Sequence, residues 1–493
     1  MSQTTTEVTK VSGLKPWVIA FAVIFPSIAF ILNQIYQGLG TWWVWPALIP
    51  LPLIWMLIGL YILSRISKKL NIGAPAMALI FTVMYMTAGS MWAFEGLHYW
   101  TSVPLPTWNQ GGPLEALYSD PYRSVAWSLE PTILAPHDAA AVNAFYLGSM
   151  EIDWGAWMPS ITYWIAWSIV CFCGAYFWSY MIRKPLVEVE KLPFTGVAPS
   201  AYMLKYYYEE EDGKSRLFNL RGLLTRMFWV GFVFGMILGL PNAISALLPT
   251  PLPYYIHQVP INWLGFTSGV LPGSTFSGNL YVPEVFGAQF APLDMLASAV
   301  LYWIVFSVIY NTLIVRAGIV PYTPGWDGSQ YQSDYGPFKY AQFSWIGLSL
   351  GLSTWVVLHY RVHIGNIFRA AFGNKSVPQE EEGIPYRIVV LGALGCSVAW
   401  IALYLVGGAA APLAIIFPFF YIFFMFGWTR MMGEVQEFMP SPQTYSGMMF
   451  DVGTGLRLWG GRPDPASWNT MLLWNANGSG QRMSSLAMHH HFK

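Results

Sequence analysis

The stretch that decides the fold is residues 265–290, which read GFTSGVLPGSTFSGNLYVPEVFGAQF. It contains five glycines and two prolines, and it lies between two long apolar runs, Leu223–Ser245 and Pro292–Val315. Glycine and proline both disfavour a smooth helix. Irregular backbone survives at membrane depth only where it is buried in protein or lines a water-filled cavity. The stretch therefore predicts either a broken membrane crossing or, as the alternative, an external loop that dips partway into the membrane.

The composition of the whole chain explains why a membrane is considered. Of the 493 residues, 55% are hydrophobic and only 10% are charged, whereas a soluble domain carries about 25% charged residues. The 25 basic residues balance the 25 acidic ones, so the net charge is zero. This balance excludes a nucleic-acid-binding protein that works through a basic surface, and the hydrophobicity excludes a disordered chain. The sequence predicts an integral membrane protein.

The apolar runs predict nine clear spans, because each is close to the length needed to cross a bilayer. No small-residue cleavage site follows the first run, so it is predicted to be an uncleaved helix rather than a signal peptide. The runs are Trp17–Tyr36, Trp43–Ser64, Pro75–Phe94, Trp157–Ile182, Leu223–Ser245, Pro292–Val315, Tyr340–Leu358, Tyr386–Val406 and Ala409–Met431.

The distribution of basic residues favours a tenth crossing. Cytoplasmic loops of membrane proteins carry an excess of lysine and arginine. If residues 266–290 cross once, 22 of the 25 basic residues fall inside, and only Arg123, Arg316 and Lys339 lie outside. The predicted fold is therefore an all-α, multi-pass bundle in the cell membrane, with about ten spans, one broken segment at 266–290 and both termini in the cytoplasm.

The predicted organisation has three parts. A cytoplasmic N-terminus covers 1–15, a transmembrane domain covers 16–432, and a cytoplasmic tail covers 433–493. The transmembrane domain includes a long outer loop, 95–156, and an inner loop, 183–221. The outer loop holds seven acidic residues and one arginine, so it would concentrate cations at the outer mouth; the alternative is a solvated lid without a ligand.

Charged residues at the ends of spans supply the candidate functional residues, because an ionisable group in lipid costs about 3 kcal/mol or more unless it is paired or hydrated. The functional interpretation is a cation- or proton-linked pathway in which Arg430 binds an anionic group, and the alternative is anchoring at the interface. Asn242, which follows Pro241 at a predicted helix break, could line a cavity or cap a neighbouring helix. The predicted pathway residues are Glu95, Asn242, Glu284, Asp294, Arg430 and Glu434.

Patterns for metals and catalysis are weak. Cys171, Cys173 and Cys396 lie inside apolar runs and are interpreted as small buried residues. His359 and His363 have the helical spacing of a metal pair, but no third ligand lies nearby, which favours an interfacial pair. The sequence contains no Walker loop, dinucleotide fingerprint, serine nucleophile elbow or HExxH motif. No cofactor, metal site or enzymatic activity is predicted.

Three further stretches resemble a prokaryotic family of oligopeptide-transporter-like membrane proteins. They read MIRKPLVEVEKLPFTGVAPSAY (181–202), GIPYRIVVLGALGCSVAW (383–400) and GWTRMMGEVQEFMP (427–440), and FAPLDMLASAVLYW (290–303) also looks like a span opening in that family, at Asp294. The resemblance rests on Glu190, Leu192, Pro193 and Phe194, on Tyr386 and Arg387, and on Arg430 and Glu434. It implies a transporter fold and suggests peptides or metal chelates as substrates.

The departures from that family shape the functional prediction. Thr195 stands where the family usually has a second proline, and the family generally continues with several more spans. We therefore expect a second subunit that supplies spans, or a homo-oligomer, in addition to the lipid bilayer and a small solute as partners. The leading hypothesis is a secondary transporter, and the alternative is a non-transporting structural subunit of a larger membrane complex. A membrane enzyme is the weakest of the three hypotheses.

Overall fold

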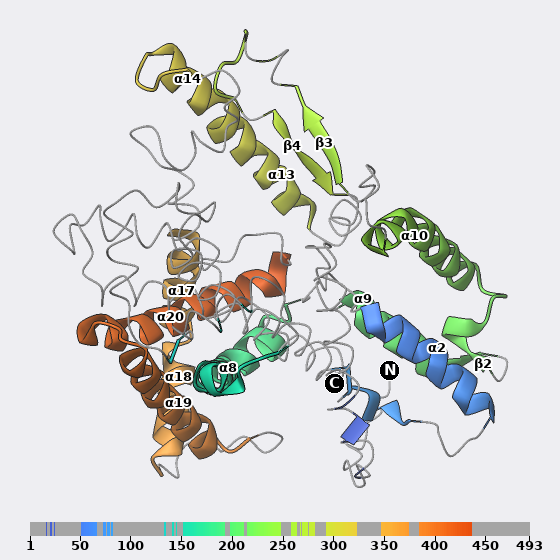
Figure 1. Ribbon diagram of the computed structural model, residues 1–493, viewed down its shortest axis with the longest axis horizontal. Coiled ribbons are helices and arrows are strands. Elements are labelled where there is room, and N and C mark those ends of the chain that lie inside the picture. Colours follow the sequence, from blue (N-terminus) through green and yellow to red (C-terminus); the bar gives the residue numbers. More distant parts are fainter. Residues whose placement is uncertain are drawn as a thin grey trace.

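The structure is a computed structural model and is mostly helical (Figure 1). It describes residues 51–66, 151–192, 198–211, 214–247, 292–322, 347–373 and 384–435, most of 72–81 and 258–281, and a few isolated positions. The described helices form a central group, and two smaller groups each include a short β-hairpin.

The central group consists of five helices that pack on one another at the lower left of Figure 1. Its core is aromatic, with Trp164, Trp167, Trp400, Tyr404 and Tyr421 fully buried. Large aromatic side chains bury much area for little conformational entropy, and their edge-to-face contacts add to the stability. The helices are α8 (Trp154–Lys184), α17 (Leu348–His359), α18 (Arg361–Ala371), α19 (Tyr386–Val406) and α20 (Ala411–Val435).

Small residues allow α8 and α19 to approach closely. A Cβ built on Gly392 would lie 2.6 Å from Cε2 of Phe177, and one built on Gly174 would lie 3.3 Å from Cβ of Cys396. The indole of Trp178 donates a hydrogen bond to Oγ of Ser397 across the same interface at 3.0 Å. Close backbone approach and polar contacts of this kind hold helices together in lipid, where there is no hydrophobic force between them.

A buried serine joins α17 to α20. Ser353 is fully buried, its Oγ accepts a hydrogen bond from the backbone N–H of Gly427 at 2.9 Å, and it donates to the carbonyl of Phe424 at 3.4 Å. The hydroxyl therefore inserts beside the helical hydrogen bonds of α20 and fixes the depth at which α17 packs.

The second group contains α2 (Leu51–Ile66), α9 (Ala198–Tyr208), the hairpin β1 (Glu210–Glu211) and β2 (Lys214–Ser215), the turn η4 (Arg216–Phe218) and α10 (Leu223–Leu247). The ring of Tyr61 stacks on Phe218 with centroids 4.1 Å apart, which joins α2 to η4. The indole of Trp229 donates to the carbonyl of Leu217 at 2.8 Å, which joins the start of α10 to the same turn.

The third group contains the glycine-rich stretch. An antiparallel hairpin is formed by β3 (Gln258–Asn262) and β4 (Ser277–Tyr281). It lies beside a helix built from α13 (Leu293–Tyr302), the π-helical η6 (Trp303–Tyr310) and α14 (Asn311–Arg316) (Figure 1).

Contacts show how the hairpin is aligned with that helix. Phe276 packs edge-to-face on Trp303 with centroids 5.2 Å apart, and a guanidinium nitrogen of Arg316 donates to the carbonyl of Val270. At the turn, Gly273 adopts a φ of +80°, and a Cβ there would lie 3.2 Å from the carbonyl oxygen of Asn311. The turn therefore packs at the Arg316 end of the helix, and β4 begins beside its middle.

This hairpin shows the path of the chain at the start of the predicted broken segment. Gln258 pairs with Tyr281, so the chain enters and leaves the hairpin at the same end. Over 258–281 the described chain doubles back, because the glycine with positive φ in the turn permits a reversal that other residues rarely adopt. The described part of the broken segment ends at Tyr281, so a crossing by residues 266–290 remains a prediction. The predicted absence of a smooth helix is confirmed for the described part of this stretch, and strands are present in a chain predicted to be all-α.

Four helices in the described part of the chain are long and apolar enough to cross a membrane: Trp154–Val189, Leu293–Arg316, Tyr386–Val406 and Ala411–Met431. Three shorter apolar helices, Leu53–Ile66, Leu223–Ile237 and Leu350–His359, overlap other predicted runs. The membrane-helix class is therefore supported, whereas the count of about ten spans is not confirmed. The orientation and the location of the termini remain predictions.

Candidate functional site

The site begins where α8 ends. The helix continues into the π-helical η3 (Pro185–Val189), because Pro185 has no N–H to donate to the carbonyl of Met181. The N–H of Glu190 instead donates to the carbonyl of Pro185 at 2.9 Å, and Lys191 takes a positive φ of 54° that ends the helix. This turn brings the side chain of Glu190 to the C-terminal half of α20.

Glu190 meets an arginine from a distant part of the chain. Its Oε2 is 3.1 Å from Nη2 of Arg430, and the same nitrogen is 3.0 Å from Oε1 of Glu434, one helical turn further along α20. The hydroxyl of Tyr360, between α17 and α18, donates to Oε1 of Glu190. The Glu190 and Arg430 side chains are each only 16% exposed. These residues and Trp355 are called the Arg430 cluster below.

Aromatic rings complete the cluster. Cζ of Arg430 lies 4.4 Å from the ring centroid of Trp355, within the range of a cation–π interaction. Two more rings contact this indole: the imidazole of His359 stacks on it with centroids 4.6 Å apart and an angle of 10° between the planes, and the ring of Tyr360 meets it edge-to-face with centroids 6.1 Å apart. The indole therefore covers one side of the guanidinium and limits the directions from which water can reach it.

The electrostatics of the cluster favour a protonated tyrosine. Burial raises the pKa of Tyr360 well above its usual value, and the hydrogen bond to the Glu190 carboxylate raises it further, while Arg430 acts in the opposite direction. Tyr360 is therefore a hydrogen-bond donor at all physiological pH values. One positive and two negative side chains meet here, and the Nε of Arg430 is buried with no hydrogen-bond partner among the described residues.

The cluster can act chemically as a charge-dependent latch. It joins η3, the α17–α18 junction and α20, and two of its links are ionic. The Glu190–Arg430 pair joins η3 to α20, and it depends on opposite charges at hydrogen-bond distance. A proton on Glu190, or an anionic group that competes for Arg430, would therefore weaken this link.

A second charged group lies nearby but forms its own contacts. Nη1 of Arg183 is 3.4 Å from Oε1 of Glu188, and its Cζ lies 5.2 Å from the Tyr180 ring centroid. On α18, His363 hydrogen-bonds the backbone of Met181, and burial followed by the charge of Lys184 lowers its pKa. The described residues include no group of three or more His, Cys, Asp or Glu side chains that could hold a metal.

The structure brings together only part of the predicted pathway. Arg430 pairs with Glu434 and also with Glu190, a residue of the stretches that resemble the oligopeptide-transporter-like family. Asp294 lies exposed in the first turn of α13, where its Oδ1 accepts a hydrogen bond from the N–H of Met295. The predicted pathway residues Glu95 and Glu284 lie outside the described residues, as do Pro193 and Phe194.

Two details differ from the sequence-based expectations. α10 continues through Pro241 to Leu247, so the helix break expected beside Asn242 is not observed. Sequence reasoning also missed Trp355 and Tyr360, because nothing in an apolar run shows which aromatic residues will face a distant arginine. The proline after Lys184 was the one local signal that the chain turns before Glu190.

Comparisons with known proteins give a family but no activity. No curated protein and no solved structure matches the chain, and nothing in the comparisons links it to the oligopeptide transporters. The model of one family of unknown function, DUF6785, matches residues 15–445, which is most of the sequence, and the chain therefore belongs to this family.

Proposed function

We propose that the protein is a secondary transporter that moves a small solute across the cell membrane, and that the Arg430 cluster is one of its gates. The observation that carries the proposal is the ion pair between Glu190 and Arg430, which joins the ends of two candidate membrane helices with little exposure to water. Peptides or metal chelates are the proposed class of solute, as the oligopeptide-transporter resemblance suggests.

Energetics support a role for the pair beyond stability. Placing charges away from water is costly, and a buried ion pair is often no more stabilising than packed apolar side chains. The surrounding helices have ample apolar residues that could have joined them. An ionic link has a different advantage, because it can be opened by a proton or by a competing ion without disrupting the aromatic core.

Alternating access gives this property a use. Transporters expose a site to one side of the membrane and then to the other as helices or repeats rock against each other. Each gate must therefore form and break in every cycle. The Glu190–Arg430 link fits this requirement, because it connects η3, which follows α8, to α20 through a single pair of side chains.

The experiment is uptake by the purified chain in proteoliposomes. Labelled di- and tripeptides and metal chelates are offered under an imposed proton or sodium gradient. We expect gradient-dependent uptake of at least one class, and a loss of tenfold or more in Glu190→Gln. Glu210→Gln, at an exposed position of β1, is the matched control and should transport normally. Folded protein that shows no uptake with either gradient across the panel would refute the proposal.

The second candidate is a non-transporting structural subunit of a larger membrane complex. The observation that favours it is the large apolar exposure of α13 and α10, where Leu293 is 82% and Val230 70% exposed. Such surfaces suit lipid or a partner helix. This candidate predicts a stoichiometric partner that co-purifies in mild detergent, whereas transport by the isolated chain would contradict it.

A further inference from the structure

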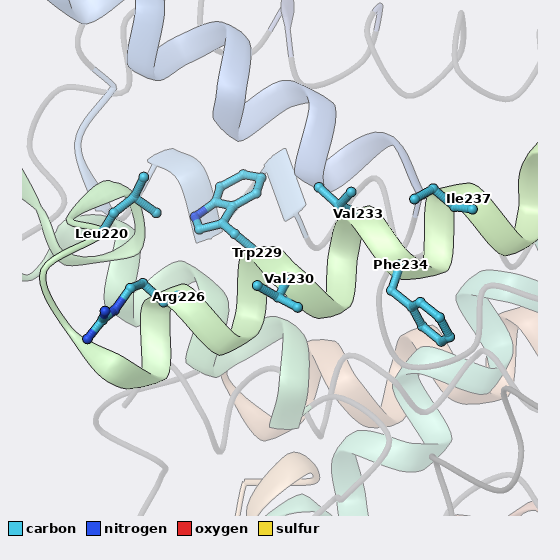
Figure 2. Close-up of a pocket in the computed structure, with 7 residues that line it drawn as sticks. All are labelled: Leu220, Arg226, Trp229, Val230, Val233, Phe234 and Ile237. Carbon is cyan, nitrogen blue, oxygen red and sulfur yellow. The ribbon is translucent and has the colours of Figure 1, made fainter.

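An open groove of about 560 Å³ runs along one face of α10 (Figure 2). All but one of its lining residues are apolar, and the exception is an arginine at one end. The lining residues are Leu220, Arg226, Trp229, Val230, Val233, Phe234 and Ile237.

The groove follows from the helical repeat. Arg226, Val230, Val233 and Ile237 are three or four residues apart, so they lie along the same face of the helix. Phe234 extends beyond this row and Trp229 stands beside it, as Figure 2 shows. The valines between these rings are short, and the hollow lies over them.

One wall of the groove is held in place. The indole of Trp229 donates to the carbonyl of Leu217 and packs against Phe218 with centroids 5.5 Å apart. Its ring therefore has a fixed position. The side chains along the bottom of the groove are accessible to a ligand, since Val230 is 70% and Ile237 60% exposed.

The charged end of the groove lies at a polar boundary. Arg226 lies near the start of α10, and the hairpin that precedes the helix presents Glu210, Glu211 and Lys214 to solvent. From Arg226 to Ile237 the helix rises by about 16 Å, and every other lining residue along that length is apolar. The groove thus has a cation at the water-facing end and an apolar channel beyond it.

We propose that this groove binds an anionic phospholipid. The phosphate-containing headgroup pairs with the guanidinium of Arg226, and an acyl chain lies along Val230, Val233 and Ile237 against the Trp229 ring. Charge complementarity favours this occupant, because its phosphate supplies an anion for the guanidinium of Arg226 while its acyl chain covers the apolar lining, whereas an apolar partner helix would leave that guanidinium without an anion. The site is independent of transport and would exist in either proposed role of the protein.

Lipid retention measured by native mass spectrometry tests the site. The purified chain is exchanged into vesicles of phosphatidylcholine, or of phosphatidylcholine with phosphatidylglycerol, and the lipids that remain bound after release into detergent are counted. We expect phosphatidylglycerol to be retained at least fivefold over phosphatidylcholine. Arg226→Gln should lose this preference and Arg226→Lys should keep most of it. Lys214→Gln, which removes an exposed cation outside the groove, should leave it unchanged.

A second variant tests the apolar part of the groove. Val230→Trp fills the hollow and should reduce retention of both lipids, whereas Leu224→Trp, at an exposed position outside the lining, should not. Equal retention of the two lipids by the wild-type chain would overturn the proposal, as would the same loss in Lys214→Gln as in Arg226→Gln. A dimer that Val230→Trp dissociates, without retained lipid, would show instead that a second copy occupies the groove.

Discussion

Arg430 illustrates how a single side chain can couple distant parts of the sequence. Its guanidinium contacts a carboxylate from the end of η3, a carboxylate from its own helix and an indole from α17. Removing one member of such a group leaves a partly buried charge without its partner. The resulting loss of stability is larger than the stability that the intact pair contributes. The effects of substitutions here should therefore be strongly non-additive.

A double-mutant cycle at Glu190 and Arg430 tests this coupling. We expect Glu190→Gln and Arg430→Met each to lower the free energy of unfolding by about 1–3 kcal/mol, because each leaves a partly buried partner unpaired. The double variant should lose less unfolding free energy than the two single variants lose in sum, with a difference of about 1 kcal/mol or more. Denaturant unfolding of the detergent-solubilised protein measures all four stabilities, and simple additivity would show that the two side chains do not interact.

The acid sensitivity of the protein should depend in part on His363. Burial and Lys184 lower its pKa, whereas the unfolded chain titrates near the usual value of about 6.5. Below that pH the unfolded state binds more protons than the folded state, so stability falls as the pH drops. His363→Gln, which can still donate to the Met181 backbone but does not titrate, should flatten this fall in the pH range below about 6.5.

Melting temperatures across that pH range measure the effect. Arg361→Gln, an exposed substitution on the same helix, should keep the wild-type slope. An unchanged slope in His363→Gln would mean that another group causes the loss of stability.

At the scale of the element, the strongest constraint is the close packing of α8 on α19. Gly392→Ala would place a methyl group 2.6 Å from the Phe177 ring, and overpacking of this kind costs about 1–3 kcal/mol. Gly395→Ala is the matched control on the same helix, because no atom lies within 4 Å of the added Cβ. Thermal unfolding should show a clear loss for the first variant and no loss for the second, and equal stabilities would argue against the observed interface.

Two long apolar helices were the most predictable part of the fold. The run Tyr386–Val406 coincides with α19, since Pro385 and Gly407 bound a continuous apolar segment. Pro292–Val315 corresponds closely to α13, η6 and α14. The π-helical character of η6 and the pairing of β3 with β4 were not predictable, because both depend on contacts between segments and not on local composition. The same reason explains why Glu190 could be noted in the sequence, while Tyr360, which donates a hydrogen bond to it, and Trp355, which packs on Arg430, could not.

For the whole molecule, the main physical constraint is the solvation of the β3–β4 hairpin. Phe276 contacts Trp303, near the middle of the candidate span Leu293–Arg316, and the turn reaches the Arg316 end of that span. A two-stranded hairpin leaves backbone polar groups at both edges, and these are tolerated at membrane depth only against protein or water. If Leu293–Arg316 crosses the membrane, the hairpin requires a hydrated or protein-lined space alongside it, whichever way the chain is oriented.

Cysteine labelling tests this requirement. The background is a variant in which the three native cysteines, Cys171, Cys173 and Cys396, are replaced by alanine. In this background Val270→Cys places a thiol at the turn, and Val300→Cys places one on α13. Both positions are more than half exposed. We expect a membrane-impermeant maleimide to react with the turn at least tenfold faster in intact proteoliposomes, because thiolate chemistry needs water. Lipid surrounds α13 in this arrangement, so Val300→Cys should react only after the bilayer is dissolved by detergent. If both positions instead react equally slowly before detergent is added, the hairpin lies in a dry environment. That result would remove the physical basis for a hydrated pathway at this segment.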